Sequence, residues 1–188
     1  MRVIAGKYKG KKLKSPSSDK TRPTLDRVKE AIFSMVNEKI EGAEVLDLFG
    51  GSGAISVEFL SRGAKYICIN DSSKEAISTI LYNIKLTNEA NCVKITLSDY
   101  KKCLKKLNSL DKTFDIIFLD PPYASDDAYE TLKYISENKG SLLKEDGIII
   151  YELEKQLLKD KYDEIPNLEC FKTRFYGRVA VKLYKWRD

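Results

Sequence analysis

Short apolar runs alternate with amphipathic segments over most of this 188-residue chain. Five runs have the length and apolar content of buried strands, and they cover residues 45–49, 66–70, 93–97, 114–119 and 147–152. Between these runs, apolar residues recur every three or four positions, which is the spacing of helices that bury one face. Strands that alternate with helices predict an α/β fold built on a mostly parallel sheet.

The two ends of the chain depart from this alternation. Residues 2–13 hold short apolar patches broken by glycines, which predicts a small hairpin, and a helix is expected over residues 25–39. Near the C-terminus, residues 170–175 and 179–184 flank a Tyr-Gly-Arg turn. This pattern predicts an antiparallel hairpin that closes the sheet.

Composition excludes several classes of protein. No apolar run approaches the roughly 20 residues that cross a bilayer, and the N-terminus lacks the apolar segment of a signal peptide. We therefore expect a cytoplasmic protein. The four cysteines form no Cys-x-x-Cys pair and histidine is absent, so the sequence offers no Ser-His-Asp triad and no zinc or other metal site.

Basic residues are concentrated at the N-terminus. The first 27 residues carry nine lysines and arginines against two aspartates, whereas the whole chain has a net charge of +5. A basic segment on a nearly neutral body is typical of proteins that bind nucleic acid, although a solvated lysine-rich surface is the alternative. The candidate binding residues are Arg2, Lys7, Lys9, Lys11, Lys12, Arg22 and Arg27.

The tetrapeptide Asp120-Pro121-Pro122-Tyr123 directly follows the apolar run of residues 114–119. In open α/β sheets, ligands bind outside the carboxyl ends of the strands. An ionised aspartate only accepts hydrogen bonds and prolines have no N–H, so this segment presents acceptors that suit an amino group. The tyrosine adds a flat face for stacking, worth about 1–3 kcal/mol per nucleobase. An ordinary turn is the alternative.

A glycine loop, Gly50-Gly51-Ser52-Gly53, follows the apolar run of residues 45–49. Such glycines let a ligand approach the backbone ahead of the next helix, although they also suit a tight turn. The next strand ends at Asp71, about twenty residues further on, where related folds bind ribose hydroxyls. Asp99 follows the third strand and could accept from an adenine amino group. Both aspartates could instead cap helices.

These motifs, each at the end of a successive strand, resemble those of the class I S-adenosylmethionine-dependent methyltransferases from Val45 to the C-terminal hairpin. The resemblance implies a Rossmann-like α/β fold with a mostly parallel seven-stranded sheet in the order 3-2-1-4-5-7-6. An antiparallel C-terminal hairpin and an N-terminal basic β-hairpin would complete it. We expect a single methyltransferase domain over residues 1–188, with a basic hairpin and loop over 1–24 and the catalytic core over 25–188.

Further segments make the resemblance more specific. Residues 2–13, 22–28 and 46–53 and the Tyr176-Gly177 turn are similar to those of the bacterial 16S ribosomal RNA guanine-N2 methyltransferase family, the RsmD type. This resemblance implies methyl transfer from S-adenosylmethionine to the exocyclic N2 of a guanine in 16S ribosomal RNA, namely guanine 966. The expected partner is that RNA or the small ribosomal subunit, bound by a monomer without a metal.

The resemblance also implies roles for particular residues. Asp47 and the glycine loop would line the methionine part of the cofactor, Asp71 would hold its ribose, and Asp99 its adenine. The full set of candidate cofactor-binding residues is Asp47, Phe49, Gly50, Gly51, Ser52, Gly53, Asp71, Ser72, Asp99 and Tyr100. The candidate catalytic residues, which would hold the target guanine, are Asp120, Pro121, Pro122 and Tyr123.

Other functions stay open at the level of sequence. DNA adenine-N6 and protein glutamine-N5 methyltransferases have a similar Pro-Pro-Tyr clamp, an NAD-dependent oxidoreductase has a similar sheet, and an RNA-binding assembly factor needs no chemistry. The basic segment argues against a glutamine substrate, and the incomplete glycine pattern argues against NAD. Arg22, Thr24 and Arg27 could order a loop over the cofactor, contact RNA or simply cap a helix.

Overall fold

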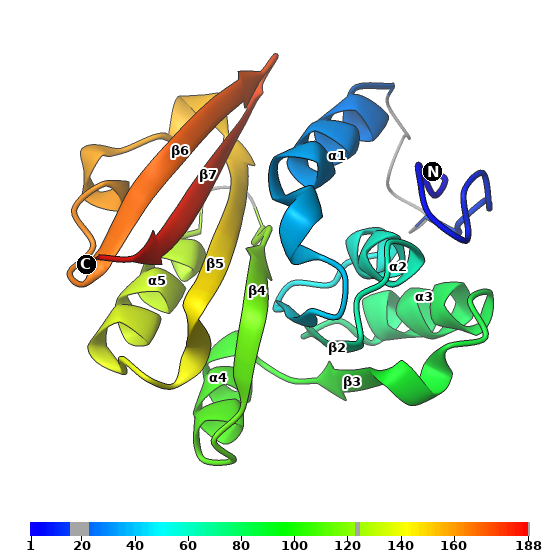
Figure 1. Cartoon of the computed structure of the whole chain (residues 1–188), viewed down its shortest axis with the longest axis horizontal. Coiled ribbons are helices and arrows are strands. Elements are labelled where there is room, and N and C mark those ends of the chain that lie inside the picture. The colour runs from blue at the N-terminus through cyan, green and yellow to red at the C-terminus, as the bar shows by residue number, and fades with distance from the viewer. Residues whose placement is uncertain (16–22, 123–124, 188) are drawn as a thin grey trace. The chain divides into compact units, whose positions relative to one another are not determined.

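The computed structural model describes residues 1–15, 23–122 and 125–187, except for the side chains of residues 23–25 and 160 (Figure 1). Seven strands form a mixed sheet in the order β3-β2-β1-β4-β5-β7-β6, which confirms the predicted order. The chain divides into two compact units, Met1–Tyr100 (unit 1) and Lys101–Asp188 (unit 2). No helix within the described ranges is long and apolar enough to traverse a bilayer.

Unit 1 contains the N-terminal half of the alternating pattern. Its strands pair in parallel, and α2 and α3 pack against each other and against those strands. The buried apolar residues of the first two strands form its core. Its elements are α1 (Pro23–Val36), η1 (Asn37–Lys39), β1 (Glu44–Asp47), α2 (Ala54–Ser61), β2 (Tyr66–Asp71), α3 (Lys74–Lys85), η2 (Ala90–Cys92) and β3 (Val93–Leu97).

Unit 2 contains one parallel pair of strands and the antiparallel hairpin. β4 and β5 run parallel, with Leu119 opposite Tyr151, and β7 lies antiparallel between β5 and β6. The predicted C-terminal hairpin is therefore confirmed. The elements of unit 2 are α4 (Tyr100–Asn108, which begins at the last residue of unit 1), β4 (Thr113–Leu119), α5 (Asp127–Glu137), β5 (Leu142–Glu154), η3 (Lys155–Leu157), η4 (Asp160–Tyr162), β6 (Leu168–Tyr176) and β7 (Val179–Trp186).

The structure differs most from the sequence prediction at the fifth strand and at the N-terminal hairpin. The helix expected over residues 25–39 is α1 followed by η1, and the strand expected over 45–49 ends at Asp47. The fifth strand begins at Leu142, five residues earlier than expected, because Leu142 and Leu143 are buried and pair with the start of β4. The N-terminal hairpin has only one antiparallel bridge, between Arg2 and Lys12, and turns occupy most of the segment between them. This segment therefore depends on contacts with the rest of unit 1.

Candidate active site

The glycine loop after β1 uses its own N–H groups to hold its shape. Gly50 N donates to the Asn70 carbonyl (2.8 Å), Gly51 N to Asp71 Oδ2 (2.9 Å) and Gly53 N to the Gly50 carbonyl (2.7 Å). Gly51 and Gly53 have φ values of +53° and +76°, which favour glycine. A Cβ at Gly51 would meet no atom within 4 Å. The loop is thus a tight turn that also leaves open space beside Gly51.

Asp71 fixes this loop from the end of β2. Its Oδ1 accepts the Ser73 amide (2.8 Å) and its Oδ2 accepts the Gly51 amide (2.9 Å). The residue that caps α3 is Ser73, whose Oγ accepts the Ala76 amide, so the capping alternative for Asp71 is wrong. Each carboxylate oxygen can accept a further hydrogen bond, which leaves capacity for two ribose hydroxyls.

Asp47, at the end of β1, carries a buried acceptor without a donor. The residue is 1% exposed, and its Oδ2 accepts from Ser56 Oγ (2.6 Å). Within the described residues, no group donates to its Oδ1. Burial, and next the nearby Asp71 carboxylate, raise the pKa of Asp47 to about 7. A bound ammonium group would supply the missing donor and favour the ionised form, so these residues fit the methionine part of S-adenosylmethionine.

The other cofactor-binding candidates lie at neighbouring strand ends of unit 1. The rings of Phe49 and Tyr100 lie 5.5 Å apart at 45°. Ser72 and Asp99 are exposed. Ser52 is used locally, since its Oγ accepts from Ala54 N (3.3 Å) and lies 3.6 Å from Met1 Sδ. That these residues contact the cofactor stays a prediction.

The acceptor loop after β4 belongs to unit 2. Asp120 is exposed, and Pro121 is buried. The Pro122 carbonyl accepts from Ser125 N (3.3 Å) and Oγ (3.0 Å), which fixes the turn. None of the described residues donates to the Pro121 carbonyl, so it keeps its acceptor capacity. Tyr123 lies outside the described residues, and its stacking role stays a prediction.

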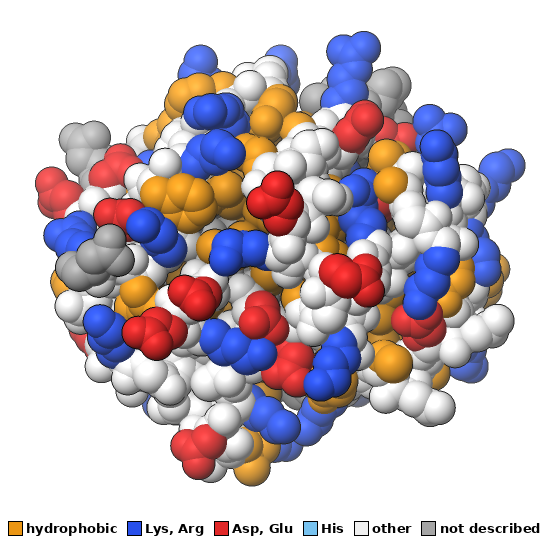
Figure 2. All heavy atoms as spheres, viewed as in Figure 1, with side chains coloured by type: hydrophobic (Ala, Val, Ile, Leu, Met, Phe, Trp, Pro, Cys, Tyr) orange, Lys and Arg blue, Asp and Glu red, His pale blue; other side chains and the backbone are white. Residues whose placement is uncertain are grey.

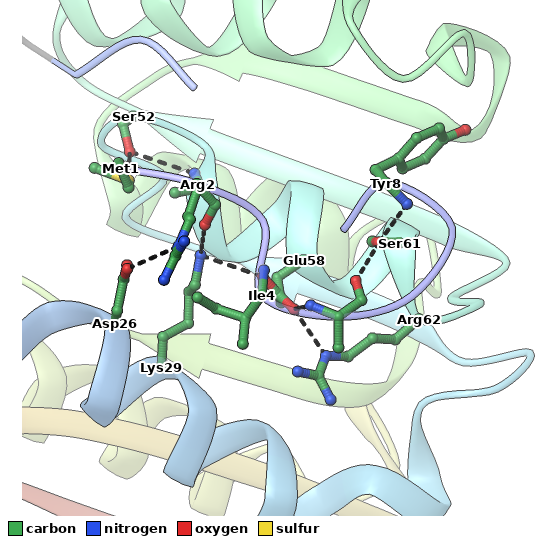
Figure 3. Close-up of polar contacts among 12 residues, drawn as sticks. Met1, Arg2, Ile4, Tyr8, Asp26, Lys29, Ser52, Glu58, Ser61 and Arg62 are labelled. Atoms are coloured by element: carbon green, nitrogen blue, oxygen red, sulfur yellow. Dashed lines mark hydrogen bonds and ion pairs between the residues drawn. The ribbon is translucent and has the colours of Figure 1, made fainter. Parts of the chain in front are cut away.

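The N-terminal segment is anchored to unit 1 by a fully buried carboxylate, that of Glu58 on α2 (Figure 3). The carboxylate accepts the amides of Ile4 (2.8 Å) and Ala5 (2.9 Å). It also pairs with Lys29 Nζ (3.2 Å) and Arg62 Nε (3.0 Å). Backbone and cations together satisfy this charge, so the segment is part of the folded unit.

The basic residues of the segment fall into two groups. Lys7 pairs with Glu89 and Lys11 donates to the Leu86 carbonyl, so both hold the segment in place. Figure 2 shows Lys and Arg side chains gathered over this part of the surface. Arg2 is exposed and lies 3.4 Å from Asp26, whereas Lys9, Lys12 and Arg27 are exposed and form no ion pair within the described residues. Arg22 lies outside the described residues, as does the side chain of Thr24.

Sequence reasoning missed three polar residues that order this side of the molecule. Asn83 on α3 donates to the carbonyls of Ser52 (2.8 Å) and Lys14 (2.9 Å), which ties the glycine loop to the N-terminal segment. Asn70 donates to the carbonyls that follow β1 and β3, and Glu58 anchors the segment. Each is buried. A polar residue at an otherwise apolar position of its helix or strand was the available signal.

Comparison with known proteins gives a consistent result. The chain matches the family described as Conserved hypothetical protein 95 over residues 1–185. It is 35% identical to YlbH of Bacillus subtilis, with 100% of both chains covered. It is 32% identical to ribosomal RNA small subunit methyltransferase D of Haemophilus influenzae, covering 98% of this chain and 93% of that protein. The solved structure of Escherichia coli YhhF has a TM-score of 0.82 at 28% identity, covering 100% of this chain and 98% of that one.

The strand order, the glycine loop after β1 and the Asp-Pro-Pro segment after β4 define a class I methyltransferase. The chain belongs to the Conserved hypothetical protein 95 family. Its similarity to the small subunit methyltransferase D of Haemophilus influenzae confirms the resemblance to the RsmD type.

Proposed function

We propose that this protein transfers a methyl group from S-adenosylmethionine to the exocyclic N2 of a guanine in 16S ribosomal RNA. Relatives that carry the name ribosomal RNA small subunit methyltransferase D support the reaction and the RNA. The choice of guanine N2, and of guanine 966, rests on the family resemblance. The observation that carries the assignment of an amino group is the acceptor loop, in which Asp120 and the Pro121 carbonyl offer only acceptors.

The chemistry is mainly a matter of alignment. When bound, S-adenosylmethionine supplies an electrophilic methyl group on a sulfonium. The lone pair of the guanine amine is delocalised into its ring, so the protein must turn that lone pair out of conjugation. Asp120 and the Pro121 carbonyl accept one amine hydrogen each, and Tyr123 stacks on the ring. Positioning of this kind contributes several kcal/mol to a reaction barrier.

The proton balance is simple. The bound cofactor would supply the methyl carbon to the amine nitrogen, and its sulfur would keep the electron pair of the carbon–sulfur bond. One amine proton then passes to Asp120 or to water. Asp47, Asp71 and the glycine loop hold the cofactor in this proposal. The enzyme acts as a cytoplasmic monomer.

The RNA must present an unpaired or flipped base, because a paired guanine cannot enter such a loop. The exposed cations Arg2, Lys9, Lys12 and Arg27 would contact the RNA backbone. An adenine-N6 target is the second candidate, since an adenine amine would also suit the acceptor loop.

The direct test is radiolabelled methyl transfer by the purified protein to 16S ribosomal RNA that lacks the modification, followed by nucleoside analysis. We expect N2-methylguanosine at one position. Labelled N6-methyladenosine would support the second candidate, and no labelled nucleoside would reject both.

A further inference from the structure

Glu152 of unit 2 has no role in the proposed mechanism. Glu152 lies on β5, where Tyr151 pairs with Leu119, the last residue of β4; Asp120 and Glu152 directly follow these two residues in the chain. Glu152 is half-buried. No described residue forms a hydrogen bond or ion pair with its carboxylate. A half-buried acidic side chain without a partner is unusual, because desolvation penalises its charge.

Glu152 faces a cavity of about 110 Å³ beside the acceptor loop. A single water needs only about 10–15 Å³ on this measure, so the cavity admits a larger ligand. Pro121 and Pro122 form part of its wall, and the rings of Tyr151 and Tyr162, 5.4 Å apart, form another part. Flat, largely apolar walls of this kind suit a planar ring.

The other charged groups at this cavity have partners. Asp126 pairs with Lys159 (3.6 Å) and Lys161 (2.8 Å). Glu154 accepts a hydrogen bond from Gln156 Nε2 (2.5 Å). Among the described residues of the cavity wall, Glu152 is thus the carboxylate left to meet a donor from a ligand.

We propose that this cavity holds the ring of the target guanine and that Glu152 accepts the guanine N1–H, so that Glu152 selects guanine over adenine. The inference rests on the proposed function and deepens it. Guanine carries adjacent donors at N1 and N2, whereas adenine has an acceptor at N1. An ionised carboxylate attracts the N1–H donor of guanine and repels the N1 acceptor of adenine. Asp120 would then accept a hydrogen bond from the reacting amine at N2, and Glu152 would accept one from the neighbouring N1–H.

The protonation of Glu152 makes this selection sensitive to pH. Burial raises the pKa of its carboxyl to about 7. Above that value the carboxylate only accepts, and below it the protonated acid can also donate. The titratable and charged groups that line the same cavity are Tyr151 and Glu154 on the strand of Glu152, Asp126 before α5, and Lys159 and Tyr162 after β5. Asp120 follows the paired strand β4, and Lys182 of β7 lies opposite Tyr151.

The test compares RNA that carries guanosine at the target with RNA that carries 2-aminopurine there. The analogue keeps the reacting amine but has an acceptor at N1. We expect the wild-type enzyme to methylate guanosine roughly 10- to 100-fold faster. In Glu152→Gln the amide can donate to the analogue, so this ratio should fall at least fivefold. Glu145→Gln, an exposed residue of the same strand, is the matched control and should keep the wild-type ratio.

A second measurement needs no variant. The wild-type ratio should fall as the pH is lowered from 8 to 6, because protonated Glu152 can donate to the analogue. Effects of pH on the methyl-transfer step are shared by both substrates and cancel in the ratio. If Glu152→Gln fails to bind the cofactor, this pH series decides the question.

The outcomes separate the inference from the function on which it rests. An unchanged ratio in Glu152→Gln, or equal loss of activity on both substrates with cofactor binding intact, would overturn the role of Glu152. So would a ratio that is constant from pH 6 to 8. If the wild-type enzyme forms no N2-methylguanosine at all, the proposed function itself is wrong.

Discussion

Two carboxylates of unit 1 and two of unit 2 have different surroundings. In unit 1, Glu58 and Asp71 accept backbone amides, and Glu58 also pairs with two cations, so these charges hold the folded chain together. In unit 2, Asp120 is exposed and Glu152 faces a cavity without a described partner. The first two carboxylates hold the folded chain, and the proposed function assigns the second two to the target base. Substitutions in the two units should therefore differ in whether stability or turnover changes.

The largest effect is expected from Glu58→Gln. The change removes the carboxylate that pairs with the buried Lys29 Nζ, which keeps the Arg2 carbonyl as an acceptor, and weakens the contacts with the N-terminal segment. Breaking a buried ion pair from one side costs about 3–5 kcal/mol. Denaturant unfolding should show this loss, with no such loss in the control Glu38→Gln, which removes an exposed charge of the same unit. Wild-type stability in Glu58→Gln would contradict the anchoring role.

The opposite result is expected from Asp120→Ala. The side chain is exposed, so unfolding should be nearly unchanged, while turnover should fall about 10²- to 10³-fold because the amine is no longer held. Calorimetry should show cofactor affinity close to the wild-type value. A methyl-transfer assay that finds wild-type turnover would remove Asp120 from the mechanism.

Asp47 sharpens the comparison, because it lies in unit 1 but keeps an acceptor without a donor. A cofactor ammonium favours the ionised carboxylate, and the pKa of Asp47 in the free protein is about 7. Affinity for S-adenosylmethionine should therefore be highest above pH 7 and fall below it, approaching tenfold per pH unit. Calorimetry at pH 8 and pH 6 measures this, and Asp47→Asn should abolish the dependence. Equal affinities of the wild-type protein at both pH values would argue against this contact.

The smallest effect concerns the exposed cations. Replacing Lys9 and Lys12 together by alanine should weaken RNA binding a few-fold and reduce its salt slope by about 2, because each phosphate contact contributes about 1. Lys65 and Lys94, exposed on the same unit, provide the matched double-alanine control. Filter binding over a range of salt concentrations gives the slopes. If the Lys9 and Lys12 double variant keeps the wild-type slope, these lysines do not contact RNA.

The sequence predicted most of the fold because strand ends and helix faces are local patterns. The apolar runs after Val45, the glycines and the terminal turn each have a physical cause within a few residues of chain. The early start of β5 at Leu142 was missed, since it depends on pairing with β4, which is distant in sequence. The reduced N-terminal hairpin was missed for a similar reason, as Glu58 and Asn83 hold that segment from other elements.

The candidate site was predictable to the same extent. Motif residues such as Asp71 and Asp120 could be named from their positions after strands. The hydrogen-bond partners of these residues could not be predicted, for example that Asp71 accepts the Gly51 amide or that Ser56 donates to Asp47. Those contacts depend on side-chain geometry, which sequence spacing does not specify.

The most direct test of the central claim is nucleoside analysis of 16S ribosomal RNA from cells that lack this protein and from the same cells complemented with it. The account predicts that one N2-methylguanosine is lost, that the wild-type gene restores it, and that the gene for Asp120→Ala does not. An unaltered N2-methylguanosine content without the protein, or full restoration by Asp120→Ala, would contradict it.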